Sequence, residues 1–188
     1  MTDADTDGEV DADPEADADR AADASRDVSD PAEDGEFGSG RNTDVEAAQT
    51  VLDQHGFLSW LGIEFVEVEE GRAVMRVPHQ EKLANWSGGS LHGGVTATVV
   101  DSCSAFALRT TFPDPLDPML VTTDLTVRYV RPATSDITVA AEVVRAGESM
   151  GMTHVEVTGT APSGEEKVVA TGGTTYRMFK NVDHAGET

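Results

Sequence analysis

The chain has 188 residues, enough for one domain of ordinary size and a tail, and its formal net charge at pH 7 is −22. Such an acidic surface keeps a protein soluble by mutual repulsion but repels phosphate backbones, which argues against nucleic acid as a partner. The single cysteine, Cys103, excludes an intrachain disulfide and a cysteine-based metal site, and the histidines show no metal-ligand spacing.

Negative charge is concentrated at the N-terminus, where residues 1–40 contain 15 acidic side chains, two arginines and few large apolar residues. Because such a segment cannot bury enough apolar surface to offset its loss of entropy, we predict a disordered acidic tail at 1–42, an ordered domain at 43–181 and a flexible C-terminus at 182–188. Only three of the 13 basic residues are lysines, a composition that indicates either a halophilic source or an ordinary acidic bacterial protein.

The sequence indicates neither a signal peptide nor a membrane span. Its N-terminus lacks a basic start followed by an apolar run, and no apolar stretch approaches the roughly 18 residues of a membrane-spanning helix. We therefore expect a cytoplasmic protein without membrane association.

The predicted domain begins with a helix and a β-hairpin. Asp44 is a suitable N-cap, and apolar residues recur at helical spacing from there to about residue 56. Residues 57–61 form a short apolar connection. Alternating apolar residues at 63–69 and 73–77, separated by a Glu-Gly pair, predict the two strands of a hairpin.

A second helix and four further strands follow. A loop at 82–90, rich in Gly, Ser and Asn, precedes an almost wholly apolar helix at 93–110, and three prolines make 111–118 a loop. The remaining strand-like segments are 120–130, 136–145, 152–160 and 167–179. A helix that is apolar on all sides must be buried. The simplest way to bury it is to wrap an antiparallel sheet of about six strands around it, which gives an α+β domain with free sheet edges that favour pairing with a second copy.

Two adjacent glycines, Gly93 and Gly94, open this central helix. Unpaired N–H groups and a partial positive charge at a helix start make it a donor site for a carbonyl oxygen or an oxyanion. The alternative is a tight turn that only allows strand and helix to pack.

Asp101 is the only acidic residue between His92 and Phe112, and its neighbours are mostly apolar. A carboxylate there is costly unless it is paired or used, which favours a general base or nucleophile over a structural aspartate. Along one helix Asp101 lies about 12 Å from Gly93, too far for both to contact one reacting atom. Antiparallel helices in a symmetric dimer would bring Asp101 of one copy near Gly93 of the other.

Two segments carry a resemblance to a known family. One runs from Asn85 to the His92-Gly93-Gly94 motif, with Asp101 nine residues after the histidine. The other, residues 120–133, contains an Arg-Pro pair near its end. Together they resemble the hotdog-fold thioesterases of the phenylacetic-acid-degradation type, over roughly residues 45–180.

This resemblance implies a hotdog fold, in which the sheet wraps around the central helix, and a homodimer or a tetramer built from dimers. The implied activity is hydrolysis of an acyl-CoA, with an aryl or medium-chain acyl group among the candidates, to the free acid and coenzyme A. Coenzyme A would be part of the substrate, and no retained cofactor or metal is implied. Two alternatives stay open, a hotdog hydratase or dehydratase and a non-catalytic acyl-CoA-binding module.

The resemblance also assigns roles to individual residues. Asp101 is the implied general base or nucleophile, and the Gly93 N–H polarises the thioester carbonyl. His92 orients the thioester, Asn85 assists at the same end, and Thr122 matches a hydroxyl that holds the attacking water. The implied substrate contacts are Gly94 at the thioester and Arg131 at a CoA phosphate.

Asn85 departs from the family spacing, since it stands seven residues before His92 where six are expected, and Trp86 holds the expected place. Either the loop carries a one-residue insertion or Asn85 is only a loop residue. Four apolar residues are candidates for an acyl pocket: Phe57, Leu58, Trp60 and Trp86. We interpret Cys103 as a small core residue rather than a nucleophile.

Overall fold

The structure, a computed structural model, describes residues 44–179, and the predicted tails at 1–42 and 182–188 lie outside them. Its helices are α1 (Val45–Gln54), α2 (Gly56–Leu61) and α3 (Gly93–Arg109), with a short 3₁₀ turn at Glu81–Leu83. Its strands are β1 (Glu64–Glu69), β2 (Arg72–Val77), β3 (Met119–Tyr129), β4 (Ile137–Ala146), β5 (Met150–Thr160) and β6 (Glu166–Phe179).

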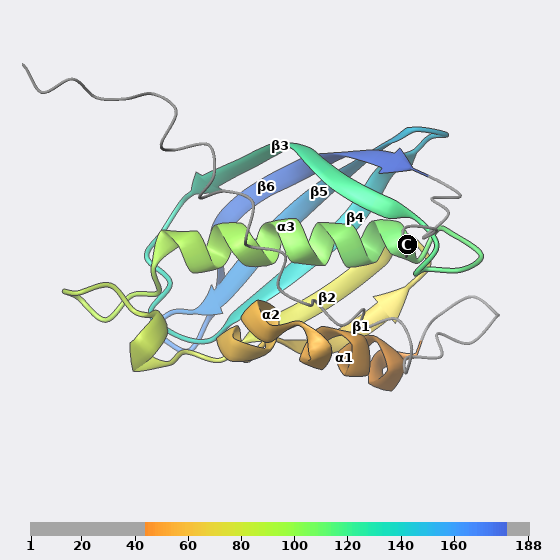
Figure 1. Cartoon of the computed structure of the whole chain (residues 1–188). Coiled ribbons are helices and arrows are strands. Elements are labelled where there is room, and N and C mark those ends of the chain that lie inside the picture. The colour runs from red at the N-terminus through yellow and green to blue at the C-terminus, as the bar shows by residue number, and fades with distance from the viewer. Residues whose placement is uncertain (1–43, 180–188) are drawn as a thin grey trace, which may run out of the picture. The chain divides into compact units, whose positions relative to one another are not determined.

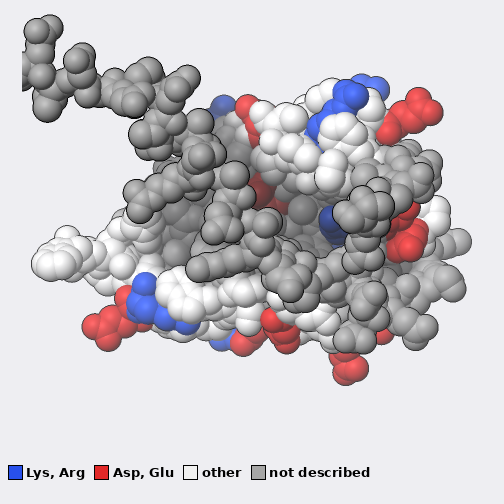
Figure 2. Space-filling model, in the orientation of Figure 1, with Lys and Arg blue, Asp and Glu red and all other residues white. Residues whose placement is uncertain are grey.

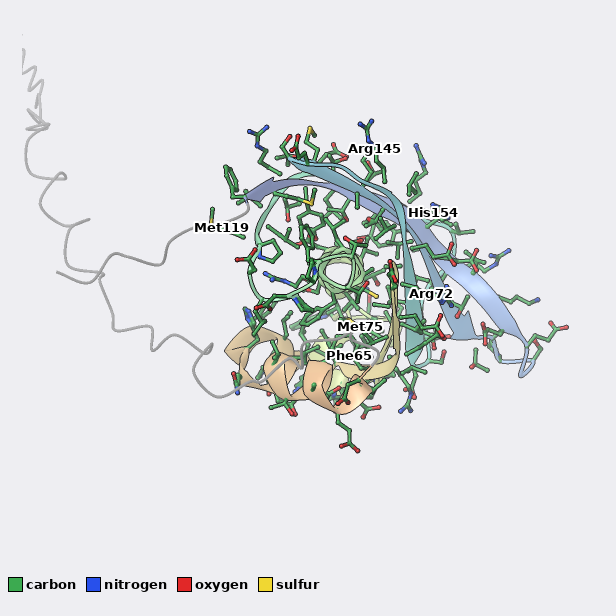
Figure 3. All side chains as sticks on the ribbon, turned by 90° about the vertical axis from the view of Figure 1, so that its right-hand side faces the viewer. Phe65, Arg72, Met75, Met119, Arg145 and His154 are labelled. Atoms are coloured by element: carbon green, nitrogen blue, oxygen red, sulfur yellow. The ribbon has the colours of Figure 1, made fainter. Side chains whose placement is uncertain are left out.

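One antiparallel sheet bends around α3 (Figures 1 and 3). The strand order is β1-β2-β4-β5-β6-β3, so the strand that follows α3 in sequence forms one edge of the sheet. Seen along α3, Phe65 and Met75 lie on the inner side of the sheet, whereas Arg72, Arg145 and His154 lie on its outer side (Figure 3). The predicted α+β architecture, a sheet of six antiparallel strands around one central helix, is confirmed.

The side of α3 that faces the sheet is tightly packed. Val99, Val100, Cys103 and Ala107 have no measurable exposure, and Phe106 makes an edge-to-face contact with Phe65 at a centroid distance of 4.9 Å. The opposite side of the helix, by contrast, is only half-buried. The residues there are Ala97, Thr98, Asp101, Ser102 and Ala105. Within residues 44–179 one side of α3 is therefore only half-buried, although its apolar sequence had suggested complete burial, because the sheet covers the helix from one side.

The segment expected to be a connection at 57–61 is helical instead, as part of α2. Leu58 and Leu61, three residues apart, are buried, while Phe57 and Trp60 are exposed. The helix ends at Gly62, whose φ of +72° is readily adopted by glycine and whose N–H donates to the Ser59 carbonyl. A single turn of apolar residues shows too little periodicity to be distinguished from a loop in the sequence.

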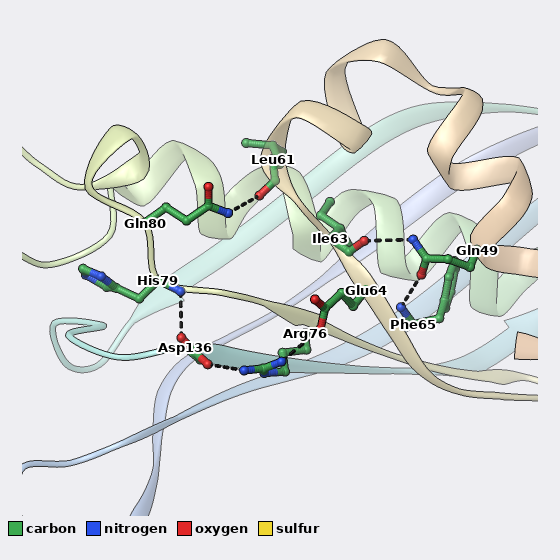
Figure 4. Close-up of polar contacts among 9 residues, drawn as sticks. All are labelled: Gln49, Leu61, Ile63, Glu64, Phe65, Arg76, His79, Gln80 and Asp136. Atoms are coloured by element: carbon green, nitrogen blue, oxygen red, sulfur yellow. Dashed lines mark hydrogen bonds and ion pairs between the residues drawn. The ribbon is translucent and has the colours of Figure 1, made fainter. Parts of the chain in front are cut away.

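Gln49 joins α1 to the free edge of β1 (Figure 4). Its amide Nε2 donates to the Ile63 carbonyl at 3.1 Å, and its Oε1 accepts the Phe65 N–H at 2.8 Å. The side chain thus occupies backbone groups that would otherwise be open at this sheet edge.

Asp136 fixes the segment that leads from β2 to α3 (Figure 4). It accepts the His79 N–H at 2.7 Å and forms an ion pair with Arg76 at 2.5 Å. The bond from the His79 N–H, followed by the Arg76 guanidinium, holds the pKa of Asp136 below its ordinary value. These bonds anchor the start of the loop that positions the helix N-terminus.

The outer surface combines ion pairs with surplus acidic charge. Arg72 pairs with Glu67 and with Glu142 across three neighbouring strands, each at 2.6 Å. Figure 2 shows acidic side chains along the lower edge of the molecule, where α1 lies. Within residues 44–179 no helix is long and apolar enough to cross a membrane.

Two adjacent glycines in β6, Gly172 and Gly173, generate a prediction about stability. A Cβ on Gly172 would overlap the Thr126 carbonyl oxygen of β3, and one on Gly173 would overlap the Thr153 carbonyl oxygen of β5. Because both neighbours are backbone atoms, we expect Gly172→Ala to lower the free energy of unfolding by about 1–3 kcal/mol in urea titrations. Gly56→Ala is the control, since a Cβ there meets nothing within 4 Å. An unchanged unfolding midpoint in Gly172→Ala would contradict this packing.

Candidate active site

The N-terminus of α3 is held by backbone bonds to two neighbouring segments. Ala84 and Leu91 form an isolated β-bridge, the Leu91 N–H donates to the Ala133 carbonyl at 2.8 Å, and the His92 N–H donates to the Leu83 carbonyl at 2.8 Å. The loop between these contacts can therefore vary in length without displacing the helix start.

His92 caps α3 with its side chain. Its Nδ1 accepts the Gly94 N–H at 2.9 Å, which requires Nδ1 to be unprotonated and, in the neutral ring, places the proton on Nε2. A Cβ on Gly94 would lie 2.9 Å from the same nitrogen, so glycine is needed here for the ring to come this close. The imidazole occupies the Gly94 N–H and so leaves that of Gly93 as the foremost donor.

The Gly93 N–H has no acceptor within residues 44–179. Its carbonyl accepts the hydroxyl of Tyr129, from the end of β3, at 2.6 Å. Gly93, Asn85, Tyr129 and Arg131 border one pocket of about 390 Å³. An unpaired N–H at the start of a 17-residue helix, on a residue that borders a pocket, suits a ligand carbonyl or oxyanion.

Asn85 lies at the same end of the helix. Its Nδ2 donates to Ser90 Oγ at 3.2 Å and to the Leu91 carbonyl at 3.1 Å, and its backbone N–H donates to the Ser90 carbonyl at 2.8 Å. Between these two residues the loop turns at Gly88 and Gly89, both at positive φ. Trp86, which occupies the expected family position, is fully exposed and borders none of the pockets described here.

Asp101 lies at the middle of α3, and two hydroxyls hold one of its carboxylate oxygens. Oδ1 accepts Thr122 Oγ1 of β3 at 3.0 Å and the Tyr176 hydroxyl of β6 at 2.8 Å. Oδ2 has no hydrogen bond to another residue in the part of the chain that the structure describes. One oxygen is therefore fixed and the other is left for a ligand.

The Asp101 carboxylate borders a second pocket, of about 400 Å³. Phe57, Leu58 and Leu125 provide apolar walls, and His55, Thr98 and Ser102 add polar groups. Two of the four predicted acyl-pocket residues, Phe57 and Leu58, are thus placed beside Asp101, whereas Trp60 and Trp86 do not border this pocket.

The two halves of the predicted site are separate in one chain. The pocket at Gly93 and the pocket at Asp101 share no lining residue, and the eight-residue spacing along α3 corresponds to about 12 Å. Gly93, His92 and Asn85 come together at one end, and Asp101 and Thr122 come together farther along the helix.

Arg131 connects the Gly93 pocket to a third pocket of about 300 Å³. Its Nη1 donates to the Val168 carbonyl at 2.6 Å, which fixes the side chain along the sheet, and the guanidinium is otherwise exposed. Lys167, Ser135 and Thr160 also border the third pocket, so it combines two cations with hydroxyl groups.

Comparison with known proteins places the chain in a family. Residues 88–161 match a family model described as the thioesterase superfamily. A Halobacterium salinarum protein with a provisional esterase name is 36% identical over 149 residues, which span 76% of this chain and 99% of that protein. Human acyl-coenzyme A thioesterase 13 is 32% identical over 130 residues, or 68% of this chain and 88% of that enzyme. The chain belongs to the hotdog-fold thioesterase superfamily.

The fold agrees with this membership. The Escherichia coli PaaI protein from the phenylacetic acid degradation operon matches 70% of this chain, and 90% of its own length, with a TM-score of 0.59 at 22% identity. The family resemblance predicted from the His-Gly-Gly motif and Asp101 is confirmed. Membership of this superfamily supports thioester hydrolysis as the general reaction.

Sequence reasoning missed two residues of this candidate site, Tyr129 and Tyr176, which are the only tyrosines in the chain. Tyr129 bonds to Gly93, and Tyr176 bonds to Asp101. Alternation in the last strand places Tyr176 on the inner face, and the β3–β6 register places it opposite Thr122. The inner face could have been predicted from the sequence, but the register could not.

Within residues 44–179 the structure gives little support for a metal site or for a cysteine nucleophile. There, no group of three or more His, Cys, Asp and Glu side chains is arranged to hold a metal ion. Cys103 is fully buried, its Sγ lies 3.3 Å from the Ala73 carbonyl, and burial raises the pKa of its thiol to about 12.

The raised pKa of Cys103 generates a prediction about reactivity. Because the group stays a protonated, buried thiol well above neutral pH, we expect the folded protein not to react with an aromatic disulfide reagent at about pH 8. The protein unfolded in guanidinium chloride should titrate one thiol per chain. Rapid modification of the folded protein would show that Cys103 is accessible and would reopen a role as a nucleophile.

Proposed function

We propose that the chain is an acyl-CoA thioesterase that hydrolyses an acyl-CoA to the free acid and coenzyme A. The observation that carries the proposal is the state of Asp101, whose Oδ1 is held by Thr122 and Tyr176 while Oδ2 has no partner in residues 44–179. A positioned carboxylate with one free oxygen beside an apolar pocket suits a general base or a nucleophile.

The chemistry admits two routes from this geometry. As a base, Asp101 takes a proton from water, the hydroxide adds to the thioester carbon, and the C–S bond breaks to release a thiolate that regains the proton. As a nucleophile, the carboxylate adds to the same carbon, expels the thiolate and forms an anhydride that water then cleaves. In the first route Thr122 would hold the attacking water.

The proposed oxyanion donor is the Gly93 N–H. Negative charge develops on the carbonyl oxygen as the thioester is attacked, and a fixed N–H at a helix N-terminus stabilises it. His92 supports this role by engaging the Gly94 N–H, so that Gly94 contributes close packing at the thioester rather than a free donor. Asn85, which borders the same pocket, would assist there.

We infer that a complete site needs two copies of the chain. Gly93 and Asp101 border different pockets, and the two residues are about 12 Å apart along one helix. One thioester carbon therefore cannot contact both of them in one chain. β3 is an edge strand in which Val121 is 43% and Leu125 40% exposed, a surface suited to pairing with a second copy around a twofold axis. A homodimer, or a tetramer built from dimers, would then contain two sites per dimer.

Coenzyme A is the proposed thiol carrier. Arg131 lies between the Gly93 pocket and the third pocket, so the carrier arm that leads away from the thioester would meet its positive charge. Lys167 also borders the third pocket, where it forms an ion pair with Glu165 at 3.0 Å. In a protein with a net charge of −22 such a position is suited to the phosphates of CoA. The acyl group would lie in the pocket of Phe57, Leu58 and Leu125.

A non-catalytic acyl-CoA-binding module and a hotdog hydratase or dehydratase are the competing functions. A binding module has no use for a carboxylate beside its apolar pocket, because the desolvation of that carboxylate disfavours binding. The free Oδ2 of Asp101 favours a reacting group over a structural one, because an unused carboxylate oxygen beside a pocket is available to water or to a thioester.

The proposal predicts release of free thiol from acyl-CoA by the wild-type protein, tested on acetyl-, phenylacetyl-, octanoyl- and palmitoyl-CoA. Asp101→Asn should lower kcat on the best substrate at least about 100-fold, the usual scale for loss of a positioned base. Asp53→Asn makes the same chemical change at an exposed site on α1 and should leave kcat unchanged. Full activity in Asp101→Asn would remove that residue from the mechanism, and no thiol release by the wild type would refute the proposed function.

A further inference from the structure

We propose that Tyr176 is a positioning residue that, together with Thr122, anchors Oδ1 of Asp101 and thereby assigns Oδ2 as the reacting oxygen. The inference rests on the proposed function. It adds a residue to that site and specifies which carboxylate oxygen attacks or takes the proton.

The geometry comes from two neighbouring strands. Thr122 of β3 and Tyr176 of β6 are direct partners in the antiparallel register, and both hydroxyls point to the same oxygen, at 3.0 and 2.8 Å. The Tyr176 oxygen also lies 2.5 Å from the backbone carbonyl oxygen of Asp101. A single hydroxyl proton is therefore shared between the side chain and the backbone of one residue, which restricts rotation of the carboxylate about its side-chain bonds.

Tyr176 acts as a permanent donor. Burial, followed by the negative charge of Asp101, raises its pKa well above the ordinary value for tyrosine. The phenol consequently stays neutral over the pH range in which proteins are stable, so it neither accepts nor supplies the proton of the reaction. Its contribution is to orient the carboxylate.

The ring itself is immobilised. Tyr176 is 2% exposed and packs in a small apolar cluster with Leu108 and Met178. Beside this cluster lies a group of buried hydroxyls, in which Thr153 and Thr174 donate to Ser104 Oγ at 2.8 and 3.1 Å. Ser104 is three residues beyond Asp101 on α3, so these bonds tie the same stretch of helix to β5 and β6.

Removal of the Tyr176 hydroxyl should therefore affect the chemical step more than binding. Tyr176→Phe keeps the ring and its packing, but releases one of the two anchors on Oδ1. We expect kcat to fall about 10-fold or more with KM within about twofold of wild type, because small errors in the position of a reacting group are costly. Thr175→Val, which removes a hydroxyl from the outer face of the same strand, should leave kcat unchanged.

The decisive comparison is made in the Asp101→Asn background. If Tyr176 acts only through the carboxylate, Tyr176→Phe causes no further loss of the residual kcat there, although it lowers the melting temperature in both backgrounds. Equal losses of kcat in both backgrounds, or an unchanged kcat in the single variant, would overturn the proposal.

A second variant covers the case in which Tyr176→Phe does not fold. Thr122→Val releases the other anchor from exposed strand β3. Because Thr122 is also proposed to hold the attacking water, its loss of kcat should become smaller, rather than disappear, in the Asp101→Asn background. A loss of the same size in both backgrounds would refute the anchored oxygen. The proposed function fails separately, if the wild type releases no thiol or if Asp101→Asn is fully active.

Discussion

The rigidity of α3 is the constraint on which the site depends. A straight helix fixes the separation of its own residues, and eight positions place the Gly93 N–H and the Asp101 carboxylate about 12 Å apart. The helix start can polarise a carbonyl and the carboxylate can deliver an attack, but one chain cannot apply both to one carbon. Each copy thus carries two complementary half-sites, which lie in different pockets.

The rest of the fold presents these half-sites. The sheet covers one side of α3 and leaves the side with Ala97, Thr98 and Asp101 half-buried. β3, the strand after the helix, forms a sheet edge and brings Thr122 to Asp101 and Tyr129 to Gly93. This half-buried helix face beside the edge strand is the surface that a second copy would complete in the proposed dimer.

The sequence predicted the features that depend on local pattern. Strand alternation, the apolar helix and the isolated Asp101 are visible in single segments. The membership of the superfamily was predicted from the His-Gly-Gly motif, its spacing to Asp101 and the later segment at 120–133. The contacts of Tyr176 and Tyr129 were missed because they depend on the register between β3 and distant elements, which no local pattern encodes. Helix α2 was missed because six residues make too little periodicity.

The most direct test of the shared site is complementation between two inactive variants. Pro is tolerated at the first helical position but has no N–H, so Gly93→Pro removes the proposed donor, while Gly93→Ala retains it as a control for the contact with Tyr129. When Asp101→Asn and Gly93→Pro chains are refolded together in equal amounts, half of the dimers are mixed and each has one intact site. We predict recovery of about a quarter of wild-type thioesterase activity. No recovery in mixed dimers shown to have formed would contradict a site built from two copies.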